Sequence, residues 1–292
     1  MPPDYQQIAE LFGLEAAQPD EVEWEETASD AGEVGVDALT KGTAKLSDGD
    51  YEAAVEHFQR AVEHQEGDPR DALIGLATAQ EMLGDSPAAF RQFRMAQRMH
   101  AKDPDPLVGL SDLYLRDGNL REALRELEAA IRAEPYNPYF HLKVAEALRS
   151  RGKLAEADTA AQQAVLLAPD QAFYHYWRGD LALERRQYLV ALDCLRAAIE
   201  LSPGDDHLLV RAALAFWGAE RPVDAIKAMR LASDLDPEKL PYYALLADFL
   251  RSEGRIDEAD TEAKRAGELD RYDRDFWIRL RREAGFKDLE LE

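Results

Sequence analysis

The amino-acid sequence repeats with a period of 34 residues, and this period restricts the possible folds more than any other feature. One position of the period holds only alanine: Ala54, Ala89, Ala123, Ala157, Ala191, Ala225 and Ala259, with one extra residue between the first two. Two further positions hold small residues: Ala61, Ala96, Ala130, Ala164, Ala198, Ala232 and Ala266 in one, and Gly42, Ala77, Ser111, Ala145, Gly179, Ala213 and Ala247 in the other. Small side chains allow two helices to approach closely. The pattern therefore indicates a helical hairpin repeated seven times.

One period, residues 104–137, shows what each repeat contains. Its first half places apolar residues at the three- and four-residue spacing of one helix face: Leu107, Leu110, Leu113 and Tyr114. Its second half does the same: Ala123, Leu124, Leu127, Ala130 and Ile131. Asp117-Gly118-Asn119 separates the halves, and Pro135 cannot continue a helix. Two helices this short cannot bury their own apolar faces, so neighbouring repeats must stack on them.

Glycine and proline mark the same two points in most repeats. The turn between the helices holds Gly49, Gly84, Gly118, Gly152 and Gly254, whereas Arg186 and Glu220 take this position in two repeats. The end of the repeat holds Pro135, Pro169, Pro203 and Pro237. Both residue types favour a break in a helix, so these positions predict where each helix ends.

The pattern resembles that of the tetratricopeptide repeat (TPR) family. The matching residues are Leu107, Leu110-Ser111, Tyr114, Ala123, Leu127 and Pro135, and near the C-terminus Tyr243, Leu246-Ala247, Leu250 and Ala259. The resemblance covers residues 35 to about 273; Arg271 replaces the last proline, and Lys41 takes a usually apolar position. It implies an all-α, right-handed superhelical solenoid of about seven helix-turn-helix repeats with a C-terminal capping helix. Such a fold is a versatile binding scaffold and does not by itself specify a partner.

We expect three segments along the chain. The repeats span 35–69, 70–103, 104–137, 138–171, 172–205, 206–239 and 240–273. Residues 274–292 start with the first-helix pattern at Trp277 and Leu280 but carry Arg279, Arg281 and Arg282 on the other sides, which is typical of a solvated capping helix with a frayed end. Residues 1–34 form an acidic and mostly disordered tail.

The tail contains ten acidic residues and neither Lys nor Arg. Asp4 can cap a short helix from Tyr5 to Phe12 that Gly13 would end. Tyr5, Ile8 and Phe12 would share one side of that helix, and Trp24 stands in an acidic stretch further on. The tail is either simply solvated, or it holds a docking motif of Tyr5, Ile8, Phe12 and Trp24 for a partner or for the protein's own groove.

The formal net charge of -23 limits the classes of partner. It disfavours nucleic acid and anionic lipid, because both need a basic face, and it favours basic protein partners. No apolar run is long enough to cross a bilayer, and the first ten residues lack the basic flank and apolar core of a secretory signal. We therefore expect a cytoplasmic protein. The single cysteine, Cys194, excludes an internal disulfide.

No pattern in the sequence indicates catalysis, a cofactor or a metal ion. There is no Gly-rich phosphate loop, no serine in a nucleophile motif and no Cys-His cluster with the spacing of metal ligands. His141 and His175 take equivalent positions in adjacent repeats, but two histidines without a third ligand make a poor metal site. We expect a protein that is not an enzyme and needs no cofactor.

The family resemblance places a binding groove on the first helices of the repeats. Repeats four to six contribute aromatic and basic residues there: Tyr139, Lys143, Arg149, Phe173, Tyr176, Trp177, Arg211 and Trp217. Aromatic and arginine side chains dominate the binding energy of protein interfaces. We predict that Tyr139, Lys143, Phe173, Tyr176, Trp177, Arg211 and Trp217 bind a peptide or helix of a protein partner. The alternative is that several of them, above all Tyr176 and Trp217, pack between hairpins.

Members of the family that bind chaperone tails hold a carboxylate with basic residues of successive first helices. The corresponding positions here hold Val108, Asp112, Leu142, Glu146, Tyr176 and Asp180, whose acids would repel a carboxylate. The prediction is therefore a scaffold or adaptor that binds a protein segment along the groove, with the tail as a possible regulator. The alternative is a structural protein that assembles through self-association of the solenoid. We expect a monomer or a weak homo-oligomer.

Overall fold

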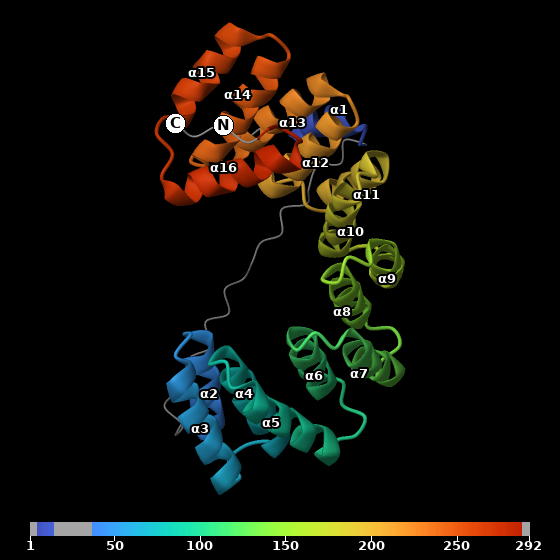
Figure 1. The fold of residues 1–292 in the computed structure, drawn as a ribbon, viewed down its shortest axis with the longest axis vertical. Helices are drawn as coiled ribbons and strands as arrows, with labels where there is room; N and C mark the ends of the chain where they lie inside the picture. Colours follow the sequence, from blue (N-terminus) through green and yellow to red (C-terminus); the bar gives the residue numbers. More distant parts are fainter. Residues whose placement is uncertain (1–4, 15–36, 288–292) are drawn as a thin grey trace. The chain divides into compact units, whose positions relative to one another are not determined.

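A computed structural model describes residues 5–14 and 37–287, and the regular structure in these ranges is entirely α-helical (Figure 1). The helices are α1 (Tyr5–Phe12), α2 (Ala38–Ser47), α3 (Tyr51–His64), α4 (Pro69–Met82), α5 (Ser86–Met99), α6 (Asp105–Arg116), α7 (Leu120–Ala133), α8 (Pro138–Arg149), α9 (Leu154–Leu167), α10 (Ala172–Glu184), α11 (Tyr188–Leu201), α12 (Asp206–Gly218), α13 (Pro222–Leu235), α14 (Leu240–Ser252), α15 (Ile256–Ala266) and α16 (Arg271–Glu283). No helix in these ranges is long and apolar enough to span a membrane.

The helices from α2 to α15 form seven hairpins, each made of a first helix and a second helix that pack along each other. This confirms the predicted all-α solenoid of seven repeats followed by a terminal helix. The positions with recurring small residues are buried, as Ser111, Ala123 and Ala130 show with no exposed surface. Small residues at these positions allow the two helix backbones to approach closely.

In the first two stacking steps, a phenylalanine on a second helix fills the space beside glycine on the next first helix. The ring of Phe58 on α3 lies against Gly75 of α4, where an added Cβ would be 2.4 Å from it. The ring of Phe93 on α5 lies in the same way against Gly109 of α6, where the distance would be 2.3 Å. Any larger residue than glycine would push these hairpins apart, because real Cβ atoms do not approach so closely.

The turn inside a hairpin needs one residue with a left-handed backbone. Glycine supplies it in five hairpins, as at Gly118 with φ 84°. Arg186 and Glu220 adopt the same conformation in the two hairpins α10–α11 and α12–α13, with φ values of 56° and 59°. A side chain in this region costs about 1 kcal/mol, because its Cβ approaches the following carbonyl oxygen.

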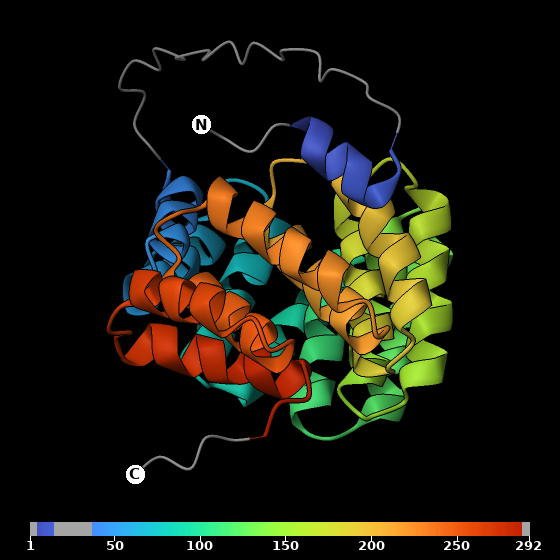
Figure 2. The same ribbon diagram turned by 90° about the horizontal axis from the view of Figure 1, so that it is seen from above.

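The helices divide into two compact units. The N-terminal unit contains α2–α9, and the C-terminal unit contains α10–α16 together with α1. The C-terminal unit has an extensive apolar core, in which Leu209, Phe216 and Phe249 are almost fully buried. Ile8 and Phe12 of α1 belong to this core, so the N-terminal helix packs with the last third of the sequence (Figure 2).

Candidate functional site

The predicted binding residues lie on the first helices of both units. Tyr139 and Lys143 are on α8 of the N-terminal unit, whereas Phe173, Tyr176 and Trp177 are on α10 of the C-terminal unit, and Arg211 and Trp217 are on its α12. We call the first helices of a unit its first-helix row. The row of the N-terminal unit is α2, α4, α6 and α8, and that of the C-terminal unit is α10, α12 and α14. The two rows differ in what covers them.

In the N-terminal unit, the Tyr139 side chain is 44% exposed, and its ring lies 5.9 Å edge-on from the ring of Phe140. Phe140 is itself buried against Leu107 and Ala130, so the hairpin core holds the backbone that presents the tyrosine. An aromatic ring that is exposed on a rigid base loses little conformational entropy when a partner covers it.

Lys143 lies next to Tyr139 along α8, between two carboxylates. Its Nζ is 2.9 Å from Asp112 Oδ1 of α6 and 3.2 Å from Glu146 Oε2. Burial would lower the pKa of Lys143, but the hydrogen bond from Nζ to Asp112 and the charges of both carboxylates outweigh it, so the pKa is raised. The ammonium is therefore fixed and charged, and the second carboxylate leaves this cluster with a net negative charge.

Further acids extend this row. Asp71 of α4 and Asp105 of α6 are exposed, and Arg70 pairs with Asp71 at 2.6 Å and with Asp103 at 3.0 Å. Burial raises the pKa of Asp105, and the nearby carboxylate of Asp103 raises it further. Half-buried Ile74 and Val108 lie on the same helices. The row thus offers negative charge beside apolar surface.

In the C-terminal unit, α10 presents one exposed aromatic residue. Phe173 is 54% exposed, whereas Trp177 is 8% exposed and belongs to the interior. The hydroxyl of Tyr176 lies 3.0 Å from His207 Nε2 of α12, and the two rings are 5.4 Å apart. Tyr176 therefore packs between neighbouring hairpins.

Arg211 and Trp217 of α12 contact the protein's own helices. The Arg211 guanidinium donates hydrogen bonds to Asp180 of α10 and to Glu283 of α16. The Trp217 ring stacks on Phe249 of α14 at 4.4 Å with an interplanar angle of 8°, and Phe286 lies 5.5 Å away. Both side chains hold the end of the chain against the row.

The C-terminal helix α16 covers the row of the C-terminal unit. Its Trp277 donates a hydrogen bond of 2.9 Å from Nε1 to Asp248 Oδ2 of α14, and Arg281 pairs with the other oxygen of Asp248 at 2.5 Å. The Arg281 guanidinium lies over the Trp277 ring at 5.1 Å. Leu280 is buried at 2% exposure. The sequence pattern placed Trp277 on the capping helix but did not predict its bond to Asp248, which anchors this helix.

The N-terminal helix α1 lies on the other side of the C-terminal unit, against the second helix α13 (Figure 2). Ile8 and Phe12 are buried there, and the Phe12 ring is 5.5 Å from Phe216 of α12. These two residues of the predicted docking motif therefore contact the protein itself. Trp24 and the Tyr5 side chain lie outside the described residues.

Nothing in the described ranges has the arrangement of a metal site, since no group of three or more His, Cys, Asp and Glu side chains is placed to hold an ion. His175 Nε2 lies 2.8 Å from the Pro169 carbonyl oxygen, and because a carbonyl only accepts, Nε2 donates this hydrogen bond. Burial lowers the pKa of His141, and the Pro135 carbonyl acts against this. Local packing accounts for both histidines.

Known proteins share this architecture. MamA of Desulfovibrio magneticus RS-1 is 29% identical over 58% of this chain and 96% of its own, with a TM-score of 0.52. A thermophilic TPR protein of Thermus thermophilus is 27% identical over 61% of this chain and 97% of its own, with a TM-score of 0.51. A tetratricopeptide repeat protein of Parabacteroides merdae is 16% identical over 83% and 96%, with a TM-score of 0.56, and is similar in fold alone.

No curated protein matches the chain. The tetratricopeptide repeat family model matches residues 39–104, 108–172, 145–206 and 176–239, which together exceed half of the 292 residues. The matched ranges coincide with the hairpins from α2 to α13. Because both the family match and the helical hairpins extend over most of its length, the chain belongs to the tetratricopeptide repeat family.

Proposed function

We propose that the protein is a non-enzymatic interaction scaffold whose N-terminal unit binds a basic and partly apolar segment of a partner protein. The observation that carries this proposal is the exposed Tyr139 ring beside the Asp112–Lys143–Glu146 cluster on the first-helix row. The TPR fold supports an interaction scaffold in general, and the site decides the kind of partner. The expected cytoplasmic location stays a prediction.

Charge supports a basic partner. Asp105 is at the surface, and its pKa is raised by its partial burial and by the nearby Asp103 carboxylate, while the charge of Arg70 acts in the opposite direction. A Lys or Arg of the partner would relieve that repulsion and gain charge-assisted hydrogen bonds. Apolar residues of the same segment would cover Tyr139 and the half-buried Ile74 and Val108.

The predicted groove residues of the C-terminal unit differ in whether a partner can reach them. Phe173 is exposed and can contact a partner directly. Arg211 and Trp217 are reached only if α16 leaves, because Glu283 and Phe286 contact them. We therefore assign Arg211 and Trp217 to holding α16, Tyr139 and Lys143 to partner binding by the N-terminal unit, and Phe173 to a separate contact on the C-terminal unit.

Regulation by the N-terminal tail also remains part of the proposal. Ile8 and Phe12 are buried in the core of the C-terminal unit, against α13 and Phe216 rather than on a first-helix face. A regulatory tail would thus act by stabilising the C-terminal unit. Removal of residues 1–34 is expected to lower the stability of that unit and to leave partner binding by the N-terminal unit unchanged.

A pair of charge reversals tests the binding site. Asp105 and Glu156 both lie in the first turn of a helix, α6 and α9, and both are exposed, but Glu156 is on a second helix away from the row. Partners are first captured from native lysate through a photo-crosslinking residue at position 139, with position 166 as the exposed control in the same unit. Affinities of the identified partner are then measured by calorimetry.

Asp105→Lys is expected to weaken binding about tenfold, because it places a like charge opposite the partner's basic residue, whereas Glu156→Lys changes it less than about twofold. Equal losses for both variants would show a general charge effect and overturn the site. Crosslinks only to a second copy of this chain would favour the alternative of self-association.

A further inference from the structure

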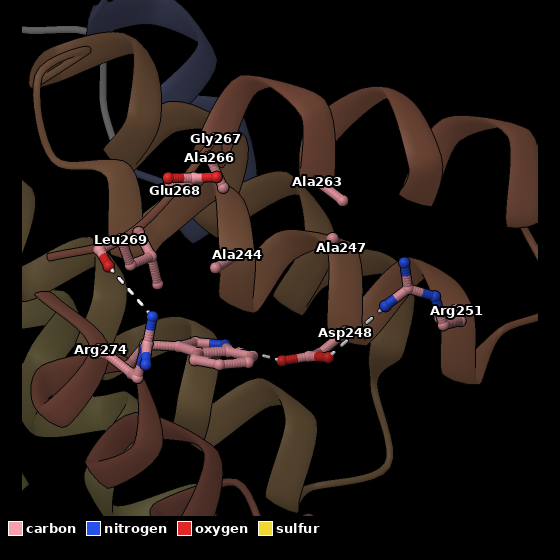
Figure 3. A pocket seen from close by; sticks show the side chains of 11 residues that line it. Ala244, Ala247, Asp248, Arg251, Ala263, Ala266, Gly267, Glu268, Leu269 and Arg274 are labelled. Atoms are coloured by element: carbon pink, nitrogen blue, oxygen red, sulfur yellow. Dashed lines mark hydrogen bonds and ion pairs between the residues drawn. The ribbon is translucent and has the colours of Figure 1, made fainter. Parts of the chain in front are cut away.

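The C-terminal unit contains a cavity of about 590 Å³ between α14, α15 and α16 (Figure 3). Alanines of two helices form its apolar surface: Ala244 and Ala247 of α14, and Ala263 and Ala266 of α15. Asp248, Arg251 and Arg274 line it as well, and Arg251 and Arg274 lie at its two ends (Figure 3). The volume is in the range of pockets that hold a small ligand or one large side chain with its neighbours.

The cavity exists because α16 does not stack as the other first helices do. In the regular steps a second helix packs against the next first helix, as α13 packs against α14, whereas α16 packs against α14 instead. The repeat position that holds Phe58 and Phe93 in earlier hairpins holds Ala263 here. The large side chain that would fill this space is therefore missing from α15, and the space opens toward solvent.

The charged side chains around the cavity differ in how well they are paired with opposite charges. Asp248 is used by Trp277 and Arg281, which contact its two oxygens at 2.9 and 2.5 Å. Arg251 reaches Asp248 only at 3.9 Å and the exposed Asp260 at 3.5 Å. Exposed pairs of that geometry contribute little binding energy, so the Arg251 guanidinium can take another partner.

Arg274 is the second available cation. Its bond among the described residues is from Nη2 to the Leu269 carbonyl at 3.4 Å, and no carboxylate in those ranges pairs with it (Figure 3). Glu268 also lines the cavity and offsets one of the two positive charges. The lining itself holds two acids and two arginines, but Asp248 is already paired with Arg281, which lies outside the lining. With Arg281 counted, the cluster has an excess of about one positive charge beside an apolar surface.

We infer that this cavity binds a segment of a partner protein in which a large apolar side chain lies next to a carboxylate. The apolar group would fill the space above the alanines and displace water from it, which is the main source of affinity. The carboxylate would pair with the guanidinium of Arg251 or Arg274, whose planar donors match two carboxylate oxygens. The site lies in the C-terminal unit and does not depend on the proposed function of the N-terminal unit.

The test uses 3-phenylpropionate as the smallest probe with both features, and 3-phenylpropylamine as the probe of opposite charge. Binding to the full chain is followed by the NMR signal of the Trp277 indole N–H, which lines the cavity and is assigned with Trp277→Phe. A probe of this size is expected to bind with a dissociation constant in the millimolar range, about 1–10 mM. The amine is expected to bind at least about fivefold more weakly.

Three variants of lining residues and one control variant make the test specific. If both guanidinium groups contact the carboxylate, Arg274→Ala and Arg251→Ala are each expected to weaken the binding of 3-phenylpropionate about fivefold. If only one of them makes the contact, its substitution alone is expected to weaken binding about tenfold. Glu268→Gln is expected to strengthen binding about two- to threefold, because it removes the like charge. Arg279→Ala on the same helix is the control, since Arg279 does not line the cavity, and it should change nothing.

Several outcomes would overturn the inference. Equal binding of the acid and the amine would show that the cavity takes apolar groups without regard to charge. If neither probe shifts the signal of the Trp277 indole at concentrations up to about 20 mM, the cavity binds neither the acid nor the amine. Loss of binding in Arg279→Ala as large as in Arg274→Ala would assign the effect to the general charge of α16. Circular dichroism of each variant verifies that α16 remains folded.

Discussion

Glu146 of α8 and Asp248 of α14 hold equivalent positions in their repeats, yet Glu146 is half exposed and Asp248 is only 8% exposed. The same contrast runs through the two first-helix rows. In the N-terminal unit the row carries exposed Asp71, Asp105 and Tyr139. In the C-terminal unit, α16 lies across α14, and Trp277 and Arg281 both bind Asp248. The row of the N-terminal unit leaves these side chains exposed, whereas α16 covers the row of the C-terminal unit.

This difference shows that equivalent first-helix surfaces of one repeat protein can be exposed in one unit and covered in the other. A helix that is apolar on all sides must be covered on all sides. Most residues of α12 and α14 are buried, including Leu214 and Leu245 at positions that hold polar residues in several other repeats. Because α16 and α1 provide cover on two sides, the C-terminal unit resembles a globular domain more than an open array.

The largest effect in this comparison is expected from loss of the side chain that anchors α16. Leu280→Ala removes a residue that is 2% exposed and should destabilise the C-terminal unit by about 2–4 kcal/mol, because a buried leucine leaves a cavity. Leu189→Ala in the same unit is the control, since Leu189 is 69% exposed, and it should stay within about 0.5 kcal/mol. Urea unfolding measures both.

Hydrogen exchange locates the effect of Leu280→Ala. Amides of α12, α14 and α16 should exchange faster, whereas those of α4 and α6 should not change, because repeat units away from the interface are only weakly coupled. Equal acceleration in both units would mean that α16 does not act as the cover of one unit.

The second effect compares the two equivalent acids directly. Asp248→Asn leaves the guanidinium of Arg281, whose side chain is 11% exposed, without its carboxylate and should cost about 2–3 kcal/mol. Glu146→Gln removes an exposed member of the Lys143 cluster and should cost less than about 0.5 kcal/mol, because Asp112 still pairs with the lysine. Similar costs for the two substitutions, measured by chemical denaturation, would contradict the distinction between a covered and an open row.

The sequence alone was sufficient to predict the hairpins. The recurring small residues must be buried for two helices to approach, and Ala123, Ala130 and Ser111 have no exposed surface. Large residues such as Phe93 at a fixed point of the repeat then set how hairpins stack. These rules are local in the sequence and recur in most repeats, so a single period contains most of the information.

The position of α16 was not predictable from such local rules. Its first residues follow the first-helix pattern, which places it at the end of the stack. Its contacts to Asp248 and Arg211, and the contact of Phe286 just after it to Trp217, join residues separated by about 30 to 70 positions. One signal was present. Leu214 and Leu245 are apolar where a solvated groove requires polar residues, and this indicates that something covers them. The docking of α1 on α13 has no comparable repeat signal.

A smaller effect concerns pH. Burial and the nearby Arg211 hold the pKa of the His207 imidazole below its ordinary value of 6.5, while Asp180, Asp205 and Asp206 act in the opposite direction. The unfolded chain therefore binds the proton at higher pH than the folded chain. Stability contributed by neutral His207 is complete above pH 6.5 and is lost as pH falls below that value toward the lower pKa of the folded state.

His207→Gln removes this titration while keeping a partner for the Tyr176 hydroxyl. The variant should show a flatter decrease of the urea midpoint between about pH 7 and 5 than the parent chain. Hydrogen exchange should place the difference in α10 and α12. A parallel decrease in both proteins would mean that other groups, among them His141 of the N-terminal unit, determine the acid sensitivity.

The smallest effect distinguishes the turns of the two units. Glu220 adopts φ 59° in the C-terminal unit, at a turn position that holds glycine in five hairpins of the two units together. Glu220→Gly relieves about 1 kcal/mol of steric cost but gives the unfolded chain more freedom, which costs about 0.5–1 kcal/mol, so we expect a gain of at most about 0.5 kcal/mol. Gly118→Ala in the N-terminal unit introduces the same steric cost and should destabilise by about 1 kcal/mol. If Glu220→Gly instead destabilises by as much as Gly118→Ala, the glutamate side chain makes an interaction that outweighs its backbone strain, and the turn edge of the C-terminal unit then becomes a third surface to test for partners.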